Sequence, residues 1–580
     1  MAQTPTTLIE LLDRVAGEEE TGLRFVDRRE RERFCSWREI HGRAVTVAGG
    51  LQRLGIVPGD RVALVYPTGP EFFDAFFGTL LAGAVPVPLY PPVRLGRLEE
   101  YHRQTAGMLR AAGARLVLAD NRVRRILGST VERSRPEFGC RALDAIEPGT
   151  FRPVAVDPEH LGLVQFSSGT TVDPKPVALS HRAFVTQAAL INSFWPENDG
   201  VHHTGVSWLP LYHDMGLIGC VGPALERPGV LTLLPPEAFI ARPALWLRAI
   251  SRHRGTISPA PNFAYALCVD RVRDEDLEGV DLSCWRVALN GAETVVPGVM
   301  RAFAERFGPY GFRESAMTPV YGMSEAALAV TFSDLETAPS VARFDREALC
   351  RRQARPDDAG REITAVGRPL PGFELRIEDE HGARLEPGRI GRIKIAGPSL
   401  MSGYLDKPEL TEKMFDGTWL DTGDLGFLWE GELFLTGRAK DMLLLRGRNH
   451  APDEVERAVD EVEGVRTGCA VAVSYLPDGG SGEELLVLVE ARKEVPAGSY
   501  EDIATECRAA VLAGAGLAAH QVIVVAPGTL PRTSSGKLRR QEALSRFLAG
   551  TLNPPEKVTA LRIAKEMARS TLAYTRAGRS

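Results

Sequence analysis

Short runs of β-branched and other apolar residues alternate with helical patterns through the first three quarters of this chain. Five of these runs have the length and composition of buried strands, at residues 61–65, 115–118, 161–166, 230–234 and 286–289. Alternation of this kind favours an α/β fold with mostly parallel sheets. At 580 residues the chain exceeds the size at which one hydrophobic core keeps growing, so two or more domains are expected.

The pattern of the sequence changes twice after this α/β region. Between residues 365 and 395, short strands with Gly/Pro turns predict a smaller β subdomain. After Asp441 the pattern predicts a separate compact unit. Its predicted elements are helices from Asp453 and Tyr500, strands at 469–473, 484–489 and 522–525, and a last helix with a frayed end from Lys557. We therefore predict a large N-terminal region of residues 1–440 and a small α+β C-terminal domain of residues 441–580.

Charge and cysteine spacing argue against several classes of protein. The formal net charge is −6, from 69 Lys and Arg against 75 Asp and Glu, and there is no long basic run. Nucleic acid is therefore not an expected partner. The eight cysteines lie far apart, without zinc-ligand or redox spacing, and are typical of buried thiols in a reducing compartment.

The sequence gives no sign of a secretory signal or a membrane span. Residues 1–18 carry Glu10 and Asp13 early and lack a basic segment followed by an apolar core. The most apolar stretch, residues 75–93, is interrupted by glycines and prolines that a spanning helix would not contain. This stretch predicts a buried helix that ends in a Pro-rich loop, and we expect a cytoplasmic protein.

A loop rich in glycine and hydroxyl residues follows the predicted strand at 161–166. Its residues are Ser167, Ser168, Gly169, Thr170, Thr171, Val172, Asp173, Pro174 and Lys175. Small residues leave backbone N–H groups open to an anion, hydroxyls add donors and Lys175 adds a positive charge, so the loop could cradle phosphates. It does not have the spacing of a Walker loop. A Ser/Thr-rich surface loop is the alternative.

This loop resembles the phosphate loop of the adenylate-forming superfamily, which includes acyl-CoA synthetases, adenylation domains and luciferases. Six further segments resemble the family's successive motifs in the family's order. They are WLPLYHDMGLIG (208–219), NGAE (290–293), YGMSE (321–325), TGD (422–424), GRAKD (437–441) and PRTSSGK (531–537). The resemblance covers nearly the whole chain, and chance agreement of seven ordered motifs is not credible.

Within the superfamily, the chain is most similar to fatty acyl-AMP ligases. Three local features indicate this group, namely YPP (90–92), the YHDMGL form of residues 212–217 and RGRNH (446–450). A fourth is the long span of residues 332–364, which resembles an insertion that marks these ligases. The resemblance implies activation of a fatty acid with ATP and Mg²⁺ to acyl-AMP and pyrophosphate, then acyl transfer to the phosphopantetheine thiol of an acyl carrier protein.

Adenylation depends on positioning and on cations, because charge grows on phosphate oxygens as the carboxylate attacks the α-phosphorus. The resemblance makes Lys537 the mobile lysine that bridges carboxylate and phosphate, with Lys175 in the phosphate loop. His213 lies where the acyl and nucleotide sites would meet, and either shapes the pocket or acts as an acid or base. Glu325 and Thr171 are the implied metal residues, which suits a hard cation shared with phosphates. Lys440 is the implied hinge of the C-terminal domain.

The resemblance also implies the residues that line the nucleotide and acyl sites. Tyr321 would stack on adenine, and Asp424 with Arg438 would contact the ribose. The other implied nucleotide residues are Ser167, Ser168, Gly169, Thr170, Thr171, Lys175, Gly291, Ala292, Glu293, Gly322, Met323 and Ser324. The candidate acyl-pocket residues are Trp208, His213, Phe239, Phe263 and Tyr265.

Each assignment has a plainer structural alternative. Lys537 and Lys440 could be solvated lysines in turns, Glu325 a first-turn charge favoured by the helix dipole, and Asp424 a turn residue. The aromatic residues could belong to the core.

The phosphate loop also departs from the family at three positions. Val172 and Pro176 stand where glycine is usual, and Asp173 adds negative charge, so ATP binding could be weaker. The alternative functions are a fatty acyl-CoA synthetase, or a ligase-like protein that binds nucleotide or acyl-adenylate without turnover. An amino-acid-activating domain is less expected.

Overall fold

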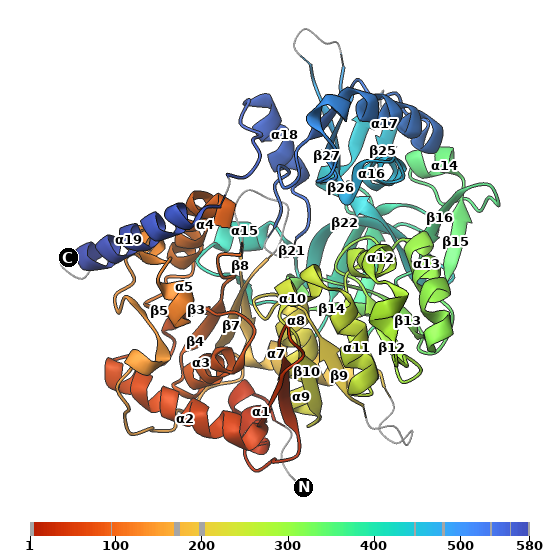
Figure 1. Ribbon diagram of the computed structural model, residues 1–580. Coiled ribbons are helices and arrows are strands. Elements are labelled where there is room, and N and C mark those ends of the chain that lie inside the picture. Colours follow the sequence, from red (N-terminus) through yellow and green to blue (C-terminus); the bar gives the residue numbers. More distant parts are fainter. Residues whose placement is uncertain are drawn as a thin grey trace.

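A nine-stranded sheet forms the centre of the N-terminal region (Figure 1). The computed structural model describes residues 5–93, 95–167, 175–195, 203–445, 448–477, 482–533, 536–556 and 558–577. The strand order is β17-β14-β13-β12-β11-β9-β10-β1-β2, parallel from β13 to β1 and antiparallel at both edges. The strands are β17 Arg368–Pro369, β14 Ala329–Phe332, β13 Met317–Gly322, β12 Val287–Asn290, β11 Ile257–Ala260, β9 Gly205–Ser207, β10 Val230–Leu233, β1 Gly22–Val26 and β2 Glu32–Ser36.

Helices connect the parallel strands of this sheet, as the alternating sequence pattern predicted. The connecting helices are α8 Asp214–Gly216, α9 Gly222–Glu226, α10 Pro236–Ala241, α11 Ala244–Arg252, α12 Asn262–Arg271 and α13 Pro297–Phe307. Three further helices are α1 Leu8–Arg14, α2 Trp37–Leu54 and α7 His181–Asn192. Both α1 and α2 begin with a capping box, formed by Thr7 with Glu10 and by Ser36 with Glu39.

A second, parallel sheet has the order β4-β3-β5-β6. It contains β4 Val85–Pro88, β3 Arg61–Val65, β5 Leu116–Ala119 and β6 Cys140–Arg141, with helices α3 Pro70–Leu81, α4 Leu98–Ala111, α5 Asn121–Arg124 and α6 Gly128–Ser134. The Pro-rich part of residues 75–93 was predicted to be a loop, but its first part, Val85–Pro88, forms edge strand β4, and residues 89–93 lie outside any strand. Proline is tolerated there because an edge strand does not need every N–H group for pairing. Among the described residues, no helix combines the length and apolar character that crossing a membrane requires.

Three antiparallel units complete the N-terminal region. A small sheet, β20-β8-β7, consists of Gly403–Tyr404, Pro176–Ser180 and Leu161–Phe166. The predicted β subdomain contains β18 Glu374–Glu378, β19 Gly391–Ala396, β21 Phe415–Asp416, β22 Trp419–Trp429 and β23 Glu432–Arg438, with α15 Pro408–Glu412 nearby. Part of the 332–364 span forms β15 Val341–Phe344, α14 Arg346–Cys350 and β16 Arg361–Thr364. The buried ring of Phe344 packs against Phe427 and Phe434 of the subdomain.

The residues after Asp441 have hydrophobic clusters of their own. Their strands are β24 Leu443–Leu445, β25 Arg448–His450, β26 Val465–Tyr475, β27 Glu484–Ala491 and β28 Gln521–Val525, and their helices are α16 Pro452–Asp460, α17 Tyr500–Ala515, α18 Arg540–Leu548 and α19 Ala560–Ala577. We call residues 441–548 the C-terminal unit.

The last helix, α19, lies apart from the C-terminal unit, beside α4 and α6 of the N-terminal region (Figure 1). Gly128 N donates a hydrogen bond to Ser570 Oγ at 2.7 Å, and Tyr574 Oη donates to Arg124 O at 2.9 Å. The buried His102 side chain lies 3.1 Å from Glu566 Oε1. The predicted helix from Lys557 is therefore docked through residues 566–574 rather than loosely attached.

Candidate active site

The predicted nucleotide motifs meet at the carboxyl ends of β12 and β13. Gly291 follows β12 and lies against β13, where a Cβ atom would be 2.8 Å from Val320 O. A side chain there would push the two strands apart, so glycine is required by close approach rather than by its dihedral angles. Gly322 is equally confined, because a Cβ atom would lie 1.9 Å from Leu328 O. The two motifs are thus held next to each other at the carboxyl ends of these strands, where ligands of parallel α/β sheets usually bind.

Tyr321, Asp424 and Arg438 form one hydrogen-bonded group. Tyr321 Oη donates to Asp424 Oδ2 at 2.7 Å, and Arg438 Nε lies 3.1 Å from Asp424 Oδ1. Asp424 and Arg438 face each other as a pair across the β22–β23 hairpin. The charge of Asp424 raises the pKa of Arg438, and burial followed by the same charge raises the pKa of Tyr321. The three residues predicted to contact adenine and ribose therefore lie together.

His213, Asp214 and Ser324 connect the predicted acyl and nucleotide sites. His213 Nδ1 lies 2.6 Å from Asp214 Oδ1, and the Ser324 hydroxyl donates to Asp214 Oδ2. Met215 N also donates to Asp214 Oδ1 at 2.7 Å. Burial alone would raise the pKa of Asp214, but the charge and hydrogen bond of His213, the Ser324 hydroxyl and the charge of Lys537 lower it to about 2. Asp214 is thus a buried, ionised carboxylate.

Lys537 enters the site from a turn of the C-terminal unit. The turn is closed by Thr533 N donating to Lys537 O at 2.8 Å and by Lys537 N donating to Thr533 Oγ1 at 3.0 Å. Burial and then the charge of Arg438 lower the pKa of Lys537, while Asp214, Glu293 and Asp424 oppose that shift. The charges that act on Lys537 therefore come from four of the predicted motifs.

Glu293 lies close to Lys537 in the same site, and a backbone N–H group holds its carboxylate. Its carboxylate accepts a hydrogen bond from Phe263 N at 2.5 Å, at the start of α12. Burial raises the pKa of Glu293, and the nearby Lys537 partly offsets this effect. Ala292, just before it, has a positive φ of 69°, which turns the chain sharply after Gly291.

Lys175 and Glu325 lie on either side of Tyr404. Tyr404 Oη donates to Glu325 Oε1 at 2.7 Å and lies 3.5 Å from Lys175 Nζ. At the base of the phosphate loop, Ser167 N donates to Lys175 O at 3.0 Å. Burial lowers the pKa of Lys175, and Glu325 opposes the shift. The remaining predicted loop residues, Ser168, Gly169, Thr170, Thr171, Val172, Asp173 and Pro174, lie outside the described residues.

The donor chemistry at Glu325 fits a magnesium ion. Its carboxylate is almost fully buried, and Tyr404 Oη donates a hydrogen bond to one of its oxygens. Magnesium in nucleotide sites is usually held by one or two carboxylates together with phosphates and water. A single buried carboxylate beside a phosphate-loop lysine matches that pattern.

Residues 13–405 match the family model described as AMP-binding enzyme. The chain belongs to this family. A putative acyl-CoA synthetase from Caulobacter vibrioides is 36% identical over 564 residues, which cover 94% of this chain and 96% of the relative. The long-chain-fatty-acid–AMP ligase FadD26 from Mycobacterium marinum is 33% identical over 550 residues, 89% of this chain and 92% of the relative.

A solved structure from a study of fatty acyl-adenylate ligases from E. coli and L. pneumophila has a TM-score of 0.87 at 32% identity. The match covers 94% of this chain and 98% of that one. This AMP-binding enzyme is therefore an adenylate-forming ligase with the α/β fold predicted from its sequence. The resemblance to fatty acyl-AMP ligases expected from the motifs is confirmed.

Four of the predicted acyl-pocket residues of this AMP-binding enzyme are aromatic, and three of them pack together. The rings of Trp208 and Phe239 stack with centroids 3.9 Å apart, and Phe263 lies edge-on to Trp208 at 6.0 Å. Tyr265 instead contacts Trp246 and donates its hydroxyl to Leu289 O at 2.9 Å, within the core. Trp246 also contacts Trp208 and Phe239, so Tyr265 joins the same buried aromatic cluster through Trp246. The acyl-pocket role of these residues stays a prediction.

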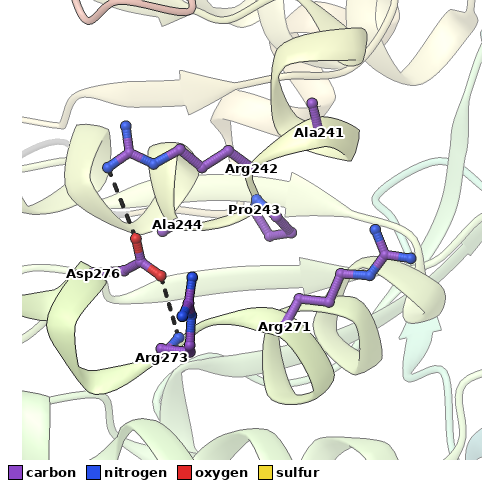
Figure 2. Close-up of a pocket in the computed structure, with 7 residues that line it drawn as sticks. All are labelled: Ala241, Arg242, Pro243, Ala244, Arg271, Arg273 and Asp276. Atoms are coloured by element: carbon purple, nitrogen blue, oxygen red, sulfur yellow. Dashed lines mark hydrogen bonds and ion pairs between the residues drawn. The ribbon is translucent and has the colours of Figure 1, made fainter.

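A separate pocket opens where α10 ends, and Figure 2 shows its lining. The cavity of about 360 Å³ is bordered by Ala241, Arg242, Pro243, Ala244, Arg271, Arg273 and Asp276. Arg242 and the backbone of Arg273 both contact Asp276, so part of the positive charge is already neutralised. The arginines make this pocket unsuitable for an acyl chain.

The predicted hinge residue, Lys440, is followed by a charged group that the sequence reasoning missed. The buried Asp441 lies 3.5 Å from Arg540 Nη1, and Arg540 also pairs with Glu456 at 2.6 Å. Burial lowers the pKa of Lys440, and the adjacent Asp441 opposes that shift. Tyr404 was missed too. The sequence showed only a tyrosine at position 404 and an arginine at position 540 near predicted motifs. Such residues are common, so they did not identify these contacts.

Proposed function

We propose that this ligase activates a medium- or long-chain fatty acid as acyl-AMP and transfers the acyl group to an acyl carrier protein. In the first step, a carboxylate oxygen of the acid attacks the α-phosphorus of ATP, and pyrophosphate leaves. In the second step, the phosphopantetheine thiol of the carrier attacks the acyl carbonyl, and AMP leaves.

The observation that most strongly supports the first step is the position of Lys537. Its ammonium group is within electrostatic reach of Asp214, Glu293, Asp424 and Arg438, which belong to four other motifs. A lysine at this junction can neutralise charge on the carboxylate and on the phosphate at once, which is the main requirement of adenylation. The proposed roles of the neighbours are ribose binding for Asp424 and Arg438, and contact with the adenine ring for Tyr321.

We propose Glu325 and Thr171 as the protein residues that hold Mg²⁺, with Lys175 as a further phosphate contact. When bound, the ion supplies positive charge that offsets the charge of the triphosphate. Pro176, where the family usually has glycine, is the first residue of β8, a position that proline tolerates. Its carbonyl accepts a hydrogen bond from Leu405 N at 2.8 Å, so the strand begins normally despite this substitution.

We propose a domain boundary at Lys440, with an N-terminal domain of residues 1–440 and a C-terminal domain of residues 441–580. Within the latter, the C-terminal unit of residues 441–548 moves about Lys440 as the hinge, while α19 stays on the N-terminal region. A rotation at Lys440 would withdraw Lys537 after the first step and admit the carrier thiol. The hydrophobic clusters after Asp441 support a separate folding unit. The similarity to FadD26, a long-chain-fatty-acid–AMP ligase, supports the fatty acid as substrate.

An acyl-CoA synthetase is the second candidate, because the relative from Caulobacter vibrioides has that name. The two functions differ only in the acceptor thiol. Purified protein with a fatty acid and ATP should acylate a phosphopantetheinylated carrier protein and form little acyl-CoA. Robust acyl-CoA formation would reverse this choice.

Exchange of pyrophosphate into ATP tests the first step alone. The rate should depend on fatty acid and should be measured over a series of chain lengths, with amino acids as the comparison. Exchange with amino acids only would identify an amino-acid-activating enzyme. Absence of exchange with every acid would indicate a protein that binds without turnover.

A further inference from the structure

Tyr404 occupies a position between two charged residues that are distant in the sequence. Its hydroxyl donates to Glu325 Oε1 at 2.7 Å and lies 3.5 Å from Lys175 Nζ. The Lys175 ammonium also lies 4.8 Å from the centroid of the Tyr404 ring. Only 3% of the Tyr404 surface is exposed. The side chain therefore contacts both charges in a site that excludes most water.

The backbone around Tyr404 is fixed to both halves of the nucleotide site. In β20, Tyr404 pairs with Val177 of β8, the strand that follows the phosphate loop. Met401 N donates to Glu325 O at 2.8 Å, and Tyr404 N donates to Thr411 Oγ1 at 2.9 Å. The segment from Met401 to Tyr404 thus bridges the Glu325 turn and the end of the phosphate loop.

A phenol is suited to this position because its hydroxyl both donates and accepts hydrogen bonds. It donates to the Glu325 carboxylate and presents its oxygen to Lys175, while the ring face adds a cation–π contact. Among the contacts of the described residues, no direct ion pair joins Lys175 to Glu325. Tyr404 is therefore the group through which the two charges are held at a fixed spacing.

We propose that Tyr404 is a positioning residue that keeps Glu325 and Lys175 arranged for magnesium-bound ATP. The inference rests on the proposed function, in which Glu325 holds the ion and Lys175 contacts phosphate. The hydroxyl acts mainly on Glu325, through the 2.7 Å hydrogen bond, whereas its contact with Lys175 is long at 3.5 Å, so the hydroxyl chiefly governs the magnesium-dependent part of binding. The ring acts mainly on Lys175, and so governs a part that needs no metal.

Two substitutions separate these contributions. Tyr404→Phe removes the hydroxyl and keeps the ring, whereas Tyr404→Leu removes both. The matched control is Tyr310→Phe, because the Tyr310 hydroxyl also donates to a carboxylate, Asp274 Oδ1 at 3.1 Å, outside the site. Binding of ATP to the full-length chain is measured by titration calorimetry with Mg²⁺ and with EDTA, and thermal midpoints report folding.

For Tyr404→Phe we expect Mg-ATP binding to weaken by about tenfold or more, because a hydrogen bond to a charged group is lost. Metal-free ATP binding should stay within about twofold of wild type. Tyr404→Leu should weaken the binding of both Mg-ATP and metal-free ATP. Tyr310→Phe should weaken the binding of neither. In pyrophosphate exchange, Tyr404→Phe should raise the KM for Mg-ATP more than it lowers kcat, and should raise the Mg²⁺ concentration needed for half-maximal rate.

The inference is overturned if Tyr404→Phe binds Mg-ATP like wild type, or if it weakens binding equally with and without Mg²⁺. Wild-type protein that binds Mg-ATP normally but shows no acid-dependent exchange would contradict the proposed function and leave the role of Tyr404 in place. Wild-type protein that binds no Mg-ATP would contradict both.

Discussion

Asp214 connects two motifs that are 110 positions apart in the sequence, because it accepts the Ser324 hydroxyl while lying beside His213. It is also one of the charges that act on Lys537. The motif match singled out His213, but the contacts are centred on its neighbour. Sequence patterns singled out this segment. They could not identify which side chain makes the long-range bonds, because those bonds depend on how β13 and α8 pack.

Lys537→Ala should lower fatty-acid-dependent pyrophosphate exchange by at least about 100-fold, or about 2.7 kcal/mol, since it removes one preorganised charge-stabilising group. Lys493→Ala is the control, because Lys493 is an exposed lysine of the same C-terminal unit. Exchange at a near wild-type rate in Lys537→Ala would remove this residue from the mechanism.

Asp214→Asn should change how stability depends on pH. The pKa of Asp214 is lowered from 3.8 to about 2, so its ionised form stabilises the folded state by about 2 kcal/mol at neutral pH. This contribution is complete above about pH 4 and is lost as the pH falls through about 2. The difference in unfolding free energy between wild type and Asp214→Asn should therefore shrink over that range.

Urea denaturation at a series of pH values measures this difference. Asp358→Asn is the control, since Asp358 is exposed in the β15–β16 connection. A difference that does not change with pH would mean that the charge of Asp214 does not stabilise the fold.

At the scale of elements, the strand predictions were accurate where burial alone determines the pattern. All five predicted strands of the α/β region appear within one residue of the expected bounds, as β3, β5, β7, β10 and β12. Strand β4 was missed because proline normally argues against a strand, and only its edge position permits it. Strand β20 has two residues and no periodicity, so only the three-dimensional pairing with β8 reveals it.

The docking of α19 was also missed, because it depends on close packing between distant segments. A Cβ atom on Gly128 would lie 2.2 Å from Ser570 O and 2.5 Å from Ser570 Cα, so only glycine allows this approach. Gly128→Ala should therefore displace α19, and amide hydrogen exchange of residues 560–577 should rise by about tenfold or more.

Gly107→Ala in α4 is the matched control, because no atom lies within 4 Å of its would-be Cβ. Unchanged exchange of α19 in Gly128→Ala would show that the helix tolerates a shift without undocking.

At the scale of the whole molecule, the contact between the 332–364 span and the C-terminal unit is charged and buried. Arg361 Nη2 lies 2.8 Å from Asp453 Oδ2, and Arg361 Nε lies 3.1 Å from Glu454 Oε1. Removing one partner of a buried pair leaves an uncompensated charge, which costs about 3 kcal/mol or more. The length of the span was visible in the sequence, but this contact was not.

Arg361→Ala should therefore lower the thermal midpoint and speed proteolysis of the C-terminal unit. Arg343→Ala is the control, because Arg343 pairs with Glu362 in the same span but is more than half exposed. Such exposed pairs contribute about 1 kcal/mol or less. Equal effects of the two substitutions would contradict the assignment of Arg361 as a buried interdomain contact.

The docked α19 has a consequence for the reach of Lys537. The C-terminal unit leaves the N-terminal region after Lys440 and is attached to it again through residues 549–559, which precede α19. Eleven extended residues span at most about 40 Å, so a second tether limits how far the unit can travel. Under the rotation proposed about Lys440, this tether would keep Lys537 at an effective concentration in the millimolar range or above near the nucleotide, and each return to the site would be a short intramolecular search.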